Sequence, residues 1–338
     1  MCTGIRLASQ EQSVVYARTL EFGNDLESQI LMIPRNYSFS GTALDNKPGL
    51  VWKSKYAVLG ANACNLLHFV DGVNEVGLAG GLFYFPGYAR YQEVQQNEGS
   101  ISLAPWQLLT WILTTCATVK EVTQKIPTIR VVKAIFGPWN MSMPVHCIVH
   151  DATSSLVIEY LNGQLTMYDN PLGVLTNAPH FEWHMTNLNN YIGLSSVNHQ
   201  PLTLDGIQLQ SFGQGSGLCG LPGDFTPPSR FVRAVIFSQS IKNSISVDEA
   251  IDNAFHILNL FDIPQGIIRD ASGKDTTYDY TQWTSLCDLQ RKQYYFTTYD
   301  NKQVHKVELL SMNLESAKEV VIAMKRDNKP LDITPKNT

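Results

Sequence analysis

The first residues of the chain, Met1-Cys2-Thr3-Gly4, place a nucleophile at an unusual position. Removal of the initiator Met is favoured when a small residue such as Cys2 follows, and it would leave Cys2 with both a thiol and a free α-amine. An α-amine has a pKa of about 7.7–8.0, so part of it is unprotonated near neutral pH. One residue could then supply both the nucleophile and its general base. A Met-Cys start is by itself most often an accident, so the rest of the chain must support this interpretation.

Arg18 is a cation that the chain could bring to Cys2. Residues 5–8 and 14–19 have the pattern of two short strands joined by polar turn residues. A tight hairpin with a three-residue loop pairs residues whose numbers sum to 20, so we expect Cys2 to face Arg18. A cation beside the thiol would lower its pKa, whereas an ordinary surface arginine is the competing interpretation. The next residues along this strand are Leu20 and Glu21.

Four aromatic rings fall within residues 83–88, directly ahead of a turn. Core packing accounts for one or two of them, and the others suggest an apolar wall for a ligand. We therefore predict that Phe83, Tyr84 and Phe85 contact a substrate, together with Leu20 of the N-terminal hairpin.

Two polar residues later in the chain are further candidates. Asn177 precedes Ala178-Pro179, where an Asn usually serves turn chemistry, but its amide could instead point into a cleft. Arg230 falls in the first turn of a predicted helix, where a cation opposes the helix dipole. A helix stabilised for its own sake would more often carry Asp or Glu there, so we expect Arg230 to serve another purpose.

The elements that must position these residues form a mixed pattern. Asn162-Gly163 is a strong hairpin signal, and we expect an antiparallel meander of four strands at 145–150, 156–161, 164–168 and 174–177. A second antiparallel pair is predicted at 278–286 and 293–298. Helices are predicted to begin near Ser102 with Pro105 in the first turn, after capping boxes at Thr118 and Ser246, and at a Ser229 cap.

Strands and helices are interleaved without regular βαβ alternation, which favours a single α+β domain with sheets packed between helices. We assign residues 1–325 to this domain and 326–338 to a polar C-terminal tail. Residues 185–217 are polar and rich in Asn, Gln, Gly and Ser, so we expect them to form a protruding loop.

Composition excludes several functional classes. The 338 residues are 44% hydrophobic and carry a net charge of −5, which leaves no basic face for nucleic acid and no polybasic patch for a membrane surface. No apolar run is long enough to span a bilayer. The first residues do not resemble a signal peptide, so we expect a cytoplasmic protein, or a periplasmic one if residues before Cys2 had been trimmed.

The cysteines and histidines do not predict a metal site. Six cysteines are scattered without a CxxC pair and are typical of reduced thiols. His146 and His150 share a face of one predicted strand but lie roughly 13 Å apart, too far to bind one zinc ion. We predict no metal and no organic cofactor.

Several motifs in this order resemble the choloylglycine hydrolases, which are bile salt hydrolases and penicillin V acylases of the N-terminal-nucleophile (Ntn) superfamily. The resemblance covers residues 2 to about 320 and implies a four-layer αββα sandwich. It also implies a homo-oligomer, a tetramer or dimer, often braced by an exchanged loop, here within 185–217. The matching motifs are Met1-Cys2-Thr3-Gly4, Arg18-Thr19-Leu20-Glu21, 74–78, Leu175–Pro179, 221–224 with 229–233, and Thr298-Tyr299-Asp300.

The resemblance assigns roles residue by residue. Cys2 would be the nucleophile with its α-amine as base, Arg18 would lie against the thiolate, Asn177 would donate to the oxyanion, and Arg230 would complete the polar network. Two positions depart from the family pattern. The carboxylate that holds the α-amine is usually Asp but here is Glu21, and Tyr84 falls where bile salt hydrolases usually have Asn and where penicillin V acylases have Tyr.

The reaction implied is hydrolysis of a linear amide through a thioester, with a small-molecule substrate whose acyl group is large and apolar. Conjugated bile salts are the first expectation. Penicillin V and acyl-homoserine lactones are the alternatives within the class. An inactive relative that only binds amphipathic ligands is the alternative from another class, and a retained Met1 would favour it.

Overall fold

Two antiparallel sheets form the centre of the computed structural model, which describes residues 1–94, 98–273, 276–327 and 329–334. The smaller sheet has the order β1-β2-β17-β18-β19, with β16 paired to β17. Its strands are β1 (Cys2–Ala8), β2 (Val14–Phe22), β16 (Ile268–Asp270), β17 (Thr277–Asp288), β18 (Gln293–Thr298) and β19 (His305–Glu308).

The larger sheet has eight strands in the order β13-β12-β11-β8-β7-β6-β3-β20. Its strands are β3 (Gln29–Ile33), β6 (Val58–Asn62), β7 (Phe69–Asn74), β8 (Ala79–Tyr84), β11 (Val145–His150), β12 (Ser155–Leu161), β13 (Gln164–Asp169) and β20 (Val320–Ala323). Small two-stranded ribbons lie outside these sheets: β4 (Ser38–Thr42) with β5 (Pro48–Lys53), and β9 (Ser102–Leu103) with β10 (Arg130–Val131).

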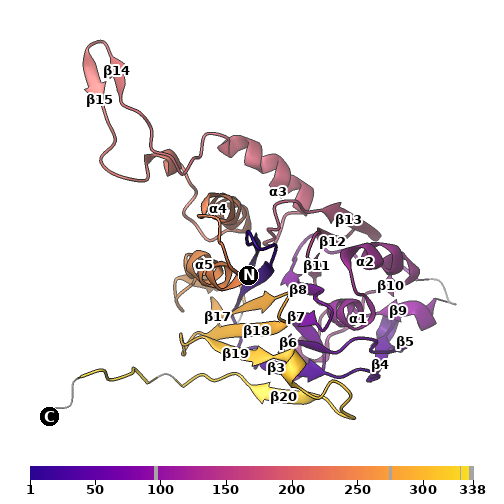
Figure 1. Cartoon of the computed structure of the whole chain (residues 1–338). Helices are drawn as coiled ribbons and strands as arrows, with labels where there is room; N and C mark the ends of the chain where they lie inside the picture. The colour runs from indigo at the N-terminus through magenta and orange to yellow at the C-terminus, as the bar shows by residue number, and fades with distance from the viewer. Residues whose placement is uncertain (95–97, 274–275, 328, 335–338) are drawn as a thin grey trace.

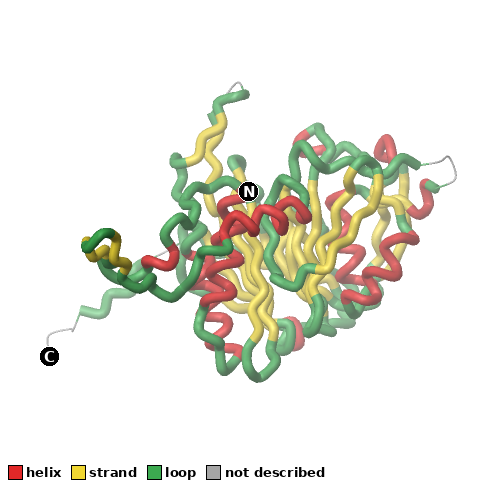
Figure 2. Tube along the Cα trace, turned by 90° about the horizontal axis from the view of Figure 1, so that it is seen from above, coloured by secondary structure: helices red, strands yellow, loops and turns green. Residues whose placement is uncertain are grey.

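Helices cover the outer face of each sheet, which gives four layers in the order αββα (Figures 1 and 2). On one side, α4 (Pro227–Ser240) and α5 (Val247–Asn259) pack on the smaller sheet, against β1 and β2. On the other side, α1 (Leu108–Thr115) packs on β7 and β8, with α2 (Val119–Lys125) beside it. A short helix, α3 (Phe181–Asn187), leads away from the sandwich. The predicted α+β fold with an αββα sandwich is confirmed.

Two apolar cores hold the layers together. One lies between the sheets and under α4 and α5, and it includes Ile5, Tyr16, Ile148 and Phe231, all fully buried. The second fills the space between the larger sheet and helices α1 and α2. Burial of this much apolar surface is the main force that stabilises a sandwich of this kind.

Local signals predicted most elements correctly. Pro105 opens a short 3₁₀ turn (Pro105–Gln107) ahead of α1. Thr118 and Ser246 cap α2 and α5 by accepting hydrogen bonds from backbone N–H groups. The first three strands of the meander and the pair formed by β17 and β18 are where the sequence places them. The cap of α4 was predicted wrongly: α4 begins at Pro227 after Thr226, so Ser229 lies inside the first turn.

The segment around 185–217 carries a finger that projects from the sandwich (Figure 1). Its tip is the hairpin of β14 (Leu202–Leu204) and β15 (Ile207–Leu209), whose side chains are exposed. The tail assigned to 326–338 has no regular structure where it is described, and part of it lies outside the described residues.

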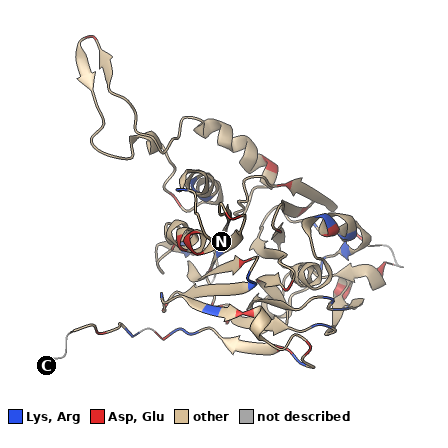
Figure 3. Cartoon of the chain, viewed as in Figure 1, with Lys and Arg blue, Asp and Glu red and all other residues tan. Residues whose placement is uncertain are grey.

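Charged residues of both signs are interspersed over the chain (Figure 3). In the described ranges, the longest apolar helical stretches fall short of what a bilayer crossing requires.

Candidate active site

The hairpin of β1 and β2 brings the candidate nucleophile and its neighbouring cation together. The observed register pairs residues whose numbers sum to 22, so Cys2 faces Leu20 and Gly4 faces Arg18. The predicted register, with Cys2 opposite Arg18, is therefore wrong by two residues. The connection spans five residues, 9–13, instead of three. Because side chains alternate between faces, a shift of two leaves each residue on its expected face.

Arg18 is completely buried between the two sheets. Its Nη1 donates to the carbonyl oxygens of Leu82 (2.7 Å) and Val70 (3.1 Å), and its guanidinium lies 4.2 Å from the centre of the Phe83 ring. Burial alone would lower the pKa of Arg18, but interactions with Cys2 and other nearby acidic groups raise it above its ordinary value. Arg18 is thus a permanent positive charge close to Cys2.

Residues 174–177 run alongside β1, a position that the sequence did not predict. They were predicted as the fourth strand of the meander, but Leu175 instead exchanges two backbone hydrogen bonds with Gly4, of 2.8 and 3.1 Å. In an antiparallel arrangement this pair places Asn177 opposite Cys2. The side chain of Asn177 reaches across the edge, and its Oδ1 accepts a 2.9 Å hydrogen bond from the backbone N–H of Cys2.

The amide of Asn177 has a fixed orientation. Its Oδ1 also accepts from Arg230 Nη2 (2.7 Å), so the other amide atom must be the nitrogen, which donates to the carbonyl of Tyr84 (2.6 Å). An amide nitrogen carries two hydrogens. One is therefore engaged with Tyr84, which leaves the second for an oxyanion.

Two buried histidines hold the backbone of residues 176 and 177 by hydrogen bonds to their carbonyl oxygens. His184 Nε2 donates to the carbonyl oxygen of Asn177 (2.9 Å), and the ring of His184 stacks on Phe231. One residue earlier, the Thr176 carbonyl accepts from His146 Nε2 (3.1 Å), and His146 Nδ1 contacts Glu159 (2.9 Å). His146 thus has a structural role that the sequence did not predict.

Arg230 lies in the first turn of α4 with its side chain fully buried. Its Nη1 donates to the backbone oxygen of Cys2 and to Thr3 Oγ1 (2.8 Å), its Nη2 to Asn177, and its Nε to the Phe225 carbonyl (2.9 Å). Burial lowers the pKa of Arg230. Its unfavourable position in the helix dipole is thus offset by contacts to both candidate catalytic segments.

Glu21 is buried at the end of β2, and one of its carboxylate oxygens is unsatisfied. Oε1 lies 3.4 Å from Thr281 Oγ1, whereas Oε2 has no hydrogen-bond partner among the described residues. The α-ammonium of Met1 donates to the backbone oxygen of Glu21 and lies 3.9 Å from the Asp279 carboxylate. Buried acceptors are normally paired, so the free oxygen marks a place for a further donor.

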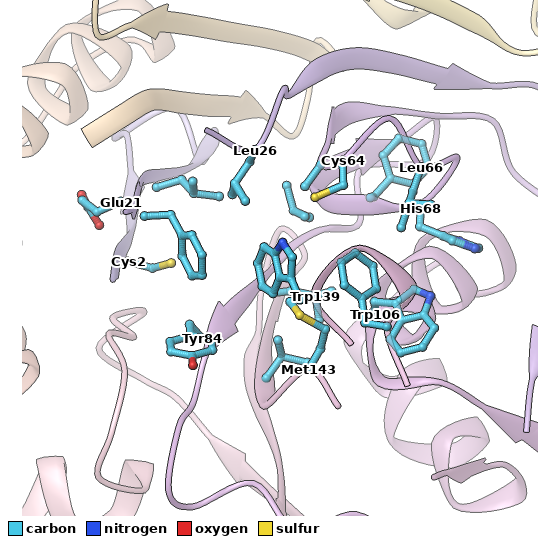
Figure 4. A pocket seen from close by; sticks show the side chains of 18 residues that line it. Cys2, Glu21, Leu26, Cys64, Leu66, His68, Tyr84, Trp106, Trp139 and Met143 are labelled. Atoms are coloured by element: carbon cyan, nitrogen blue, oxygen red, sulfur yellow. The ribbon is translucent and has the colours of Figure 1, made fainter. Parts of the chain in front are cut away.

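An apolar pocket opens beside Cys2, and the Cys2 thiol points into it (Figure 4). It encloses about 680 Å³, its mouth included. Trp139 stacks on Phe22 with ring centres 4.8 Å apart, and Phe136 packs edge-on against Trp139. The lining residues are Cys2, Leu20, Glu21, Phe22, Leu26, Ala63, Cys64, Leu66, His68, Phe69, Val70, Leu82, Tyr84, Trp106, Phe136, Trp139, Met143 and Val145.

Of the four residues predicted to contact substrate, Leu20 and Tyr84 line this pocket, and Phe83 and Phe85 do not. Phe83 is fully buried under Arg18, where it lies so close to Gly4 that a Cβ there would approach it to 2.7 Å. Phe85 is fully buried and stacks on His146 at 4.1 Å. Alternation along β8 explains the difference, because Tyr84 points to the face opposite its two neighbours.

Most of the pocket wall was not predicted from the sequence. The 3₁₀ turn Gly137–Trp139 contributes Trp139, and the loop after it contributes Met143. The cluster Phe136-Gly137-Pro138-Trp139, with two aromatic residues at a turn, was the available signal. In the described part of the chain, no three or more His, Cys, Asp or Glu residues are arranged to hold a metal ion.

Known proteins similar to this chain include amide hydrolases. Residues 2–322 match the model of the linear amide C–N hydrolases, choloylglycine hydrolase family. The chain is 34% identical to the bile salt hydrolase/transferase of Clostridium perfringens, over 100% of both chains. It superposes on the C2A mutant of conjugated bile acid hydrolase from the same organism with a TM-score of 0.87 and 31% identity, covering 99% of this chain and 100% of the other.

A more distant structure shares the fold. The penicillin V acylase of Agrobacterium tumefaciens superposes with a TM-score of 0.77 at 22% identity, covering 95% of this chain and 91% of that one. The motifs around Cys2, Arg18 and Asn177 thus lie in a sandwich common to both kinds of enzyme. The chain belongs to the choloylglycine hydrolase family of linear amide C–N hydrolases.

Proposed function

We propose that the protein hydrolyses conjugated bile salts, with Cys2 as nucleophile and a thioester as intermediate. The observation that carries the proposal is the position of Cys2, whose thiol opens into an apolar pocket while its backbone nitrogen is held by Asn177. The bile salt hydrolases among its relatives support the choice of substrate. The steroid would occupy the pocket, and the amine half would lie outside it.

The reaction begins once Met1 has been removed, because an amide nitrogen cannot accept a proton. The Cys2 α-amine takes the thiol proton, and the sulfur attacks the amide carbonyl. The second N–H of Asn177 and backbone donors stabilise the oxyanion. The α-ammonium then protonates the departing amine as the C–N bond breaks.

Hydrolysis of the thioester reverses these roles. The freed α-amine takes a proton from water, and the resulting hydroxide attacks the thioester carbonyl. The C–S bond breaks, the carboxylic acid leaves, and the thiol regains its proton. Arg18 stabilises the thiolate at both stages without exchanging a proton, since an arginine remains charged.

The unsatisfied oxygen of Glu21 supports this sequence of events. Removal of Met1 frees the α-amine of Cys2, and an ammonium there would be a donor for Glu21 Oε2. Glu21 directly follows Leu20, the strand partner of Cys2, and would take the place of the family's Asp. Arg230 would hold the backbone of Cys2 while the α-amine changes charge.

Penicillin V is the second candidate substrate, because Tyr84 lines the pocket where bile salt hydrolases usually have Asn. A panel of taurocholate, glycocholate, penicillin V and acyl-homoserine lactones tests both possibilities. We expect the fastest hydrolysis with the bile salts. Hydrolysis of none of the four, by protein that has lost Met1, would favour the inactive binder.

We further propose that the finger joins copies of the chain into a tetramer or dimer. Its exposed apolar residues, Leu202, Leu204, Ile207, Leu209 and Phe212, support this role. Light scattering after gel filtration measures the assembly, and replacing Leu204 and Ile207 with Ser should shift it toward the monomer. All six cysteines are free, which supports a reducing compartment such as the cytoplasm.

A further inference from the structure

Asp71 is a fully buried carboxylate between the two sheets. It lies on β7, which packs against β17 and β18 of the smaller sheet. Its Oδ1 accepts hydrogen bonds from Tyr294 Oη (2.6 Å) and the backbone N–H of Ala61 (3.4 Å), and its Oδ2 accepts from Ser285 Oγ. A buried carboxylate is normally paired with a cation or neutralised, so its neighbours decide its role.

The strand registers bring Arg18 to this carboxylate from both sheets. Ser285 pairs with Arg18 in the smaller sheet, so a strand neighbour of Arg18 donates to Asp71. In the larger sheet Asp71 pairs with Gly81, where a Cβ would approach Arg18 Nη1 to 3.0 Å. Directly paired residues have their Cβ positions on one face, about 4.5–5.5 Å apart. The guanidinium and the carboxylate therefore lie close together, and the carbonyl of Val70, next to Asp71, accepts from the same Nη1.

The two charges stabilise each other. Burial raises the pKa of Asp71, and the charge of Arg18 is the strongest interaction that opposes this rise. Burial lowers the pKa of Arg18, but four interactions raise it above its ordinary value, with Cys2, Tyr16, Asp71 and Glu21. The positive charge near Cys2 is therefore partly offset by carboxylates, of which Asp71 takes no part in the chemistry proposed above.

Neighbouring phenols, thiols and a histidine add no charge to this cluster near neutral pH. Burial raises the pKa of each phenol and thiol, so these groups keep their protons: Tyr16, Tyr294, Cys147 and Cys287. The ring of His150 stacks on Tyr16, and burial lowers the pKa of this histidine, so the ring is neutral. Exchange of Asp71 for a neutral residue would thus change the field at Cys2 without a second charge to replace it.

We propose that Asp71 is a positioning residue that limits how strongly Arg18 attracts negative charge at Cys2. Its carboxylate offsets part of the guanidinium charge from the side of β7. The thiol then keeps its proton until the α-amine of Cys2 takes it, as the first step of the proposed mechanism requires. A thiol of very low pKa would also be a weaker nucleophile once ionised. This consequence for catalysis rests on the proposed function, whereas the effect of Asp71 on the thiol does not depend on a substrate.

Asp71→Asn tests the charge with almost no change of shape, because the amide can accept from one hydroxyl and donate to the other. Loss of a negative charge close to Arg18 should lower the pKa of the Cys2 thiol by about one unit. The measurement is the pH dependence of alkylation by iodoacetamide in protein that has lost Met1. Mass spectrometry of the N-terminal peptide separates Cys2 from the other cysteines. An unchanged or raised thiol pKa would overturn the proposal.

Two further variants separate the charge from stability. Asp71→Ser removes the same charge, leaves space for a water molecule, and should give the same shift if Asp71→Asn does not fold. Asp288→Asn is the matched control, since Asp288 is also fully buried but bonds to Arg291 and pairs with Val15, far along β2 from Cys2. It should lower stability without moving the thiol pKa. An equal shift in Asp288→Asn would show that the effect does not act through Arg18.

Failure of the proposed function would be visible separately. The acid limb of kcat/KM for glycocholate should move to lower pH in Asp71→Asn, together with the thiol pKa. If the wild-type protein hydrolyses no substrate, the proposed function fails, and alkylation still decides the role of Asp71. If hydrolysis is present and both pH profiles are unchanged in Asp71→Asn, the proposed function stands and the role of Asp71 is wrong.

Discussion

The two halves of the site are built by opposite means. At the catalytic end, hydrogen bonds join Cys2, Asn177 and Arg230 to one another. The pocket beyond it is held by ring stacking and apolar packing, as between Phe22 and Trp139. Directional bonds fix the positions of reacting atoms, whereas apolar packing tolerates exchange of one side chain for another. Substitutions in the first half should therefore affect kcat, and those in the second should affect KM.

The largest effect is expected at Cys2. Cys2→Ala removes the nucleophile and should abolish turnover, while the fold and ligand affinity should persist because the exchange removes only one sulfur atom. Cys2→Ser should retain little activity, since the hydroxyl ionises far above neutral pH. Mass spectrometry of the wild-type enzyme should also show that Met1 is absent. Substantial hydrolysis by Cys2→Ala, or full activity with Met1 retained, would move the chemistry to another residue.

The second-largest effect is expected for Asn177→Asp, which should lower kcat by a factor of at least 10²–10³. The substitution replaces the N–H donors with a negative charge that repels the oxyanion, and the loss of one such donor already costs that much elsewhere. The carboxylate would still accept from Cys2 and Arg230, so the fold should persist. Thermal unfolding measured alongside separates catalysis from stability. A well-folded variant with near-normal kcat would leave only backbone donors for the oxyanion.

Trp139→Leu should have a smaller effect, confined to the pocket half. It removes the ring that stacks on Phe22 and faces the acyl group. We expect KM for glycocholate to rise about ten-fold with kcat little changed, as for loss of uniform binding. Steady-state kinetics with substrates of different acyl size would check it. A fall in kcat with unchanged KM would show that the two halves are not separable in this way.

The smallest effect is expected for His184, and it should appear in how the free energy of unfolding depends on pH. Burial is the main cause that lowers its pKa from 6.5 to about 4. The unfolded chain therefore binds a proton between these values that the folded chain does not, so the free energy of unfolding should fall as pH decreases from about 6.5 to 4. His184→Gln can keep the donor to Asn177 but not the titration, and its acid loss should be smaller. Denaturant unfolding at pH 7, 5.5 and 4.5 measures this. Equal losses in both proteins would contradict it.

The same contrast explains what could be predicted from the sequence. Capping boxes at Thr118 and Ser246 are local, so the start of each helix was predictable. The N-terminal register was not, because residues 9–13 close a wider loop in which Ser9 N donates to the Ser13 carbonyl (2.8 Å) and Gln12 takes a positive φ. That loop depends on hydrogen bonds that composition does not reveal.

Contacts between segments that are distant in the sequence could not be predicted either. Leu175 pairs with Gly4, which lies 171 positions earlier in the chain. Nothing in the sequence near residue 175 shows that this segment pairs with β1 instead of forming a fourth strand of the meander. The pocket wall combines residues from several separate segments, among them Phe22, Cys64, Trp106 and Trp139. Motif resemblance proposed Cys2, Asn177 and Arg230 as site residues, and the structure joins these three by hydrogen bonds. The pocket wall has no such motif.

The hydrogen bond from the Met1 ammonium to the backbone of Glu21 has a practical consequence. Under the proposed mechanism, a chain that retains Met1 would be an inactive precursor, and the aminopeptidase that removes this residue would be its activator. A purification tag fused to the N-terminus would keep the protein latent unless a protease leaves Cys2 first. A tag at the C-terminus would leave this maturation undisturbed.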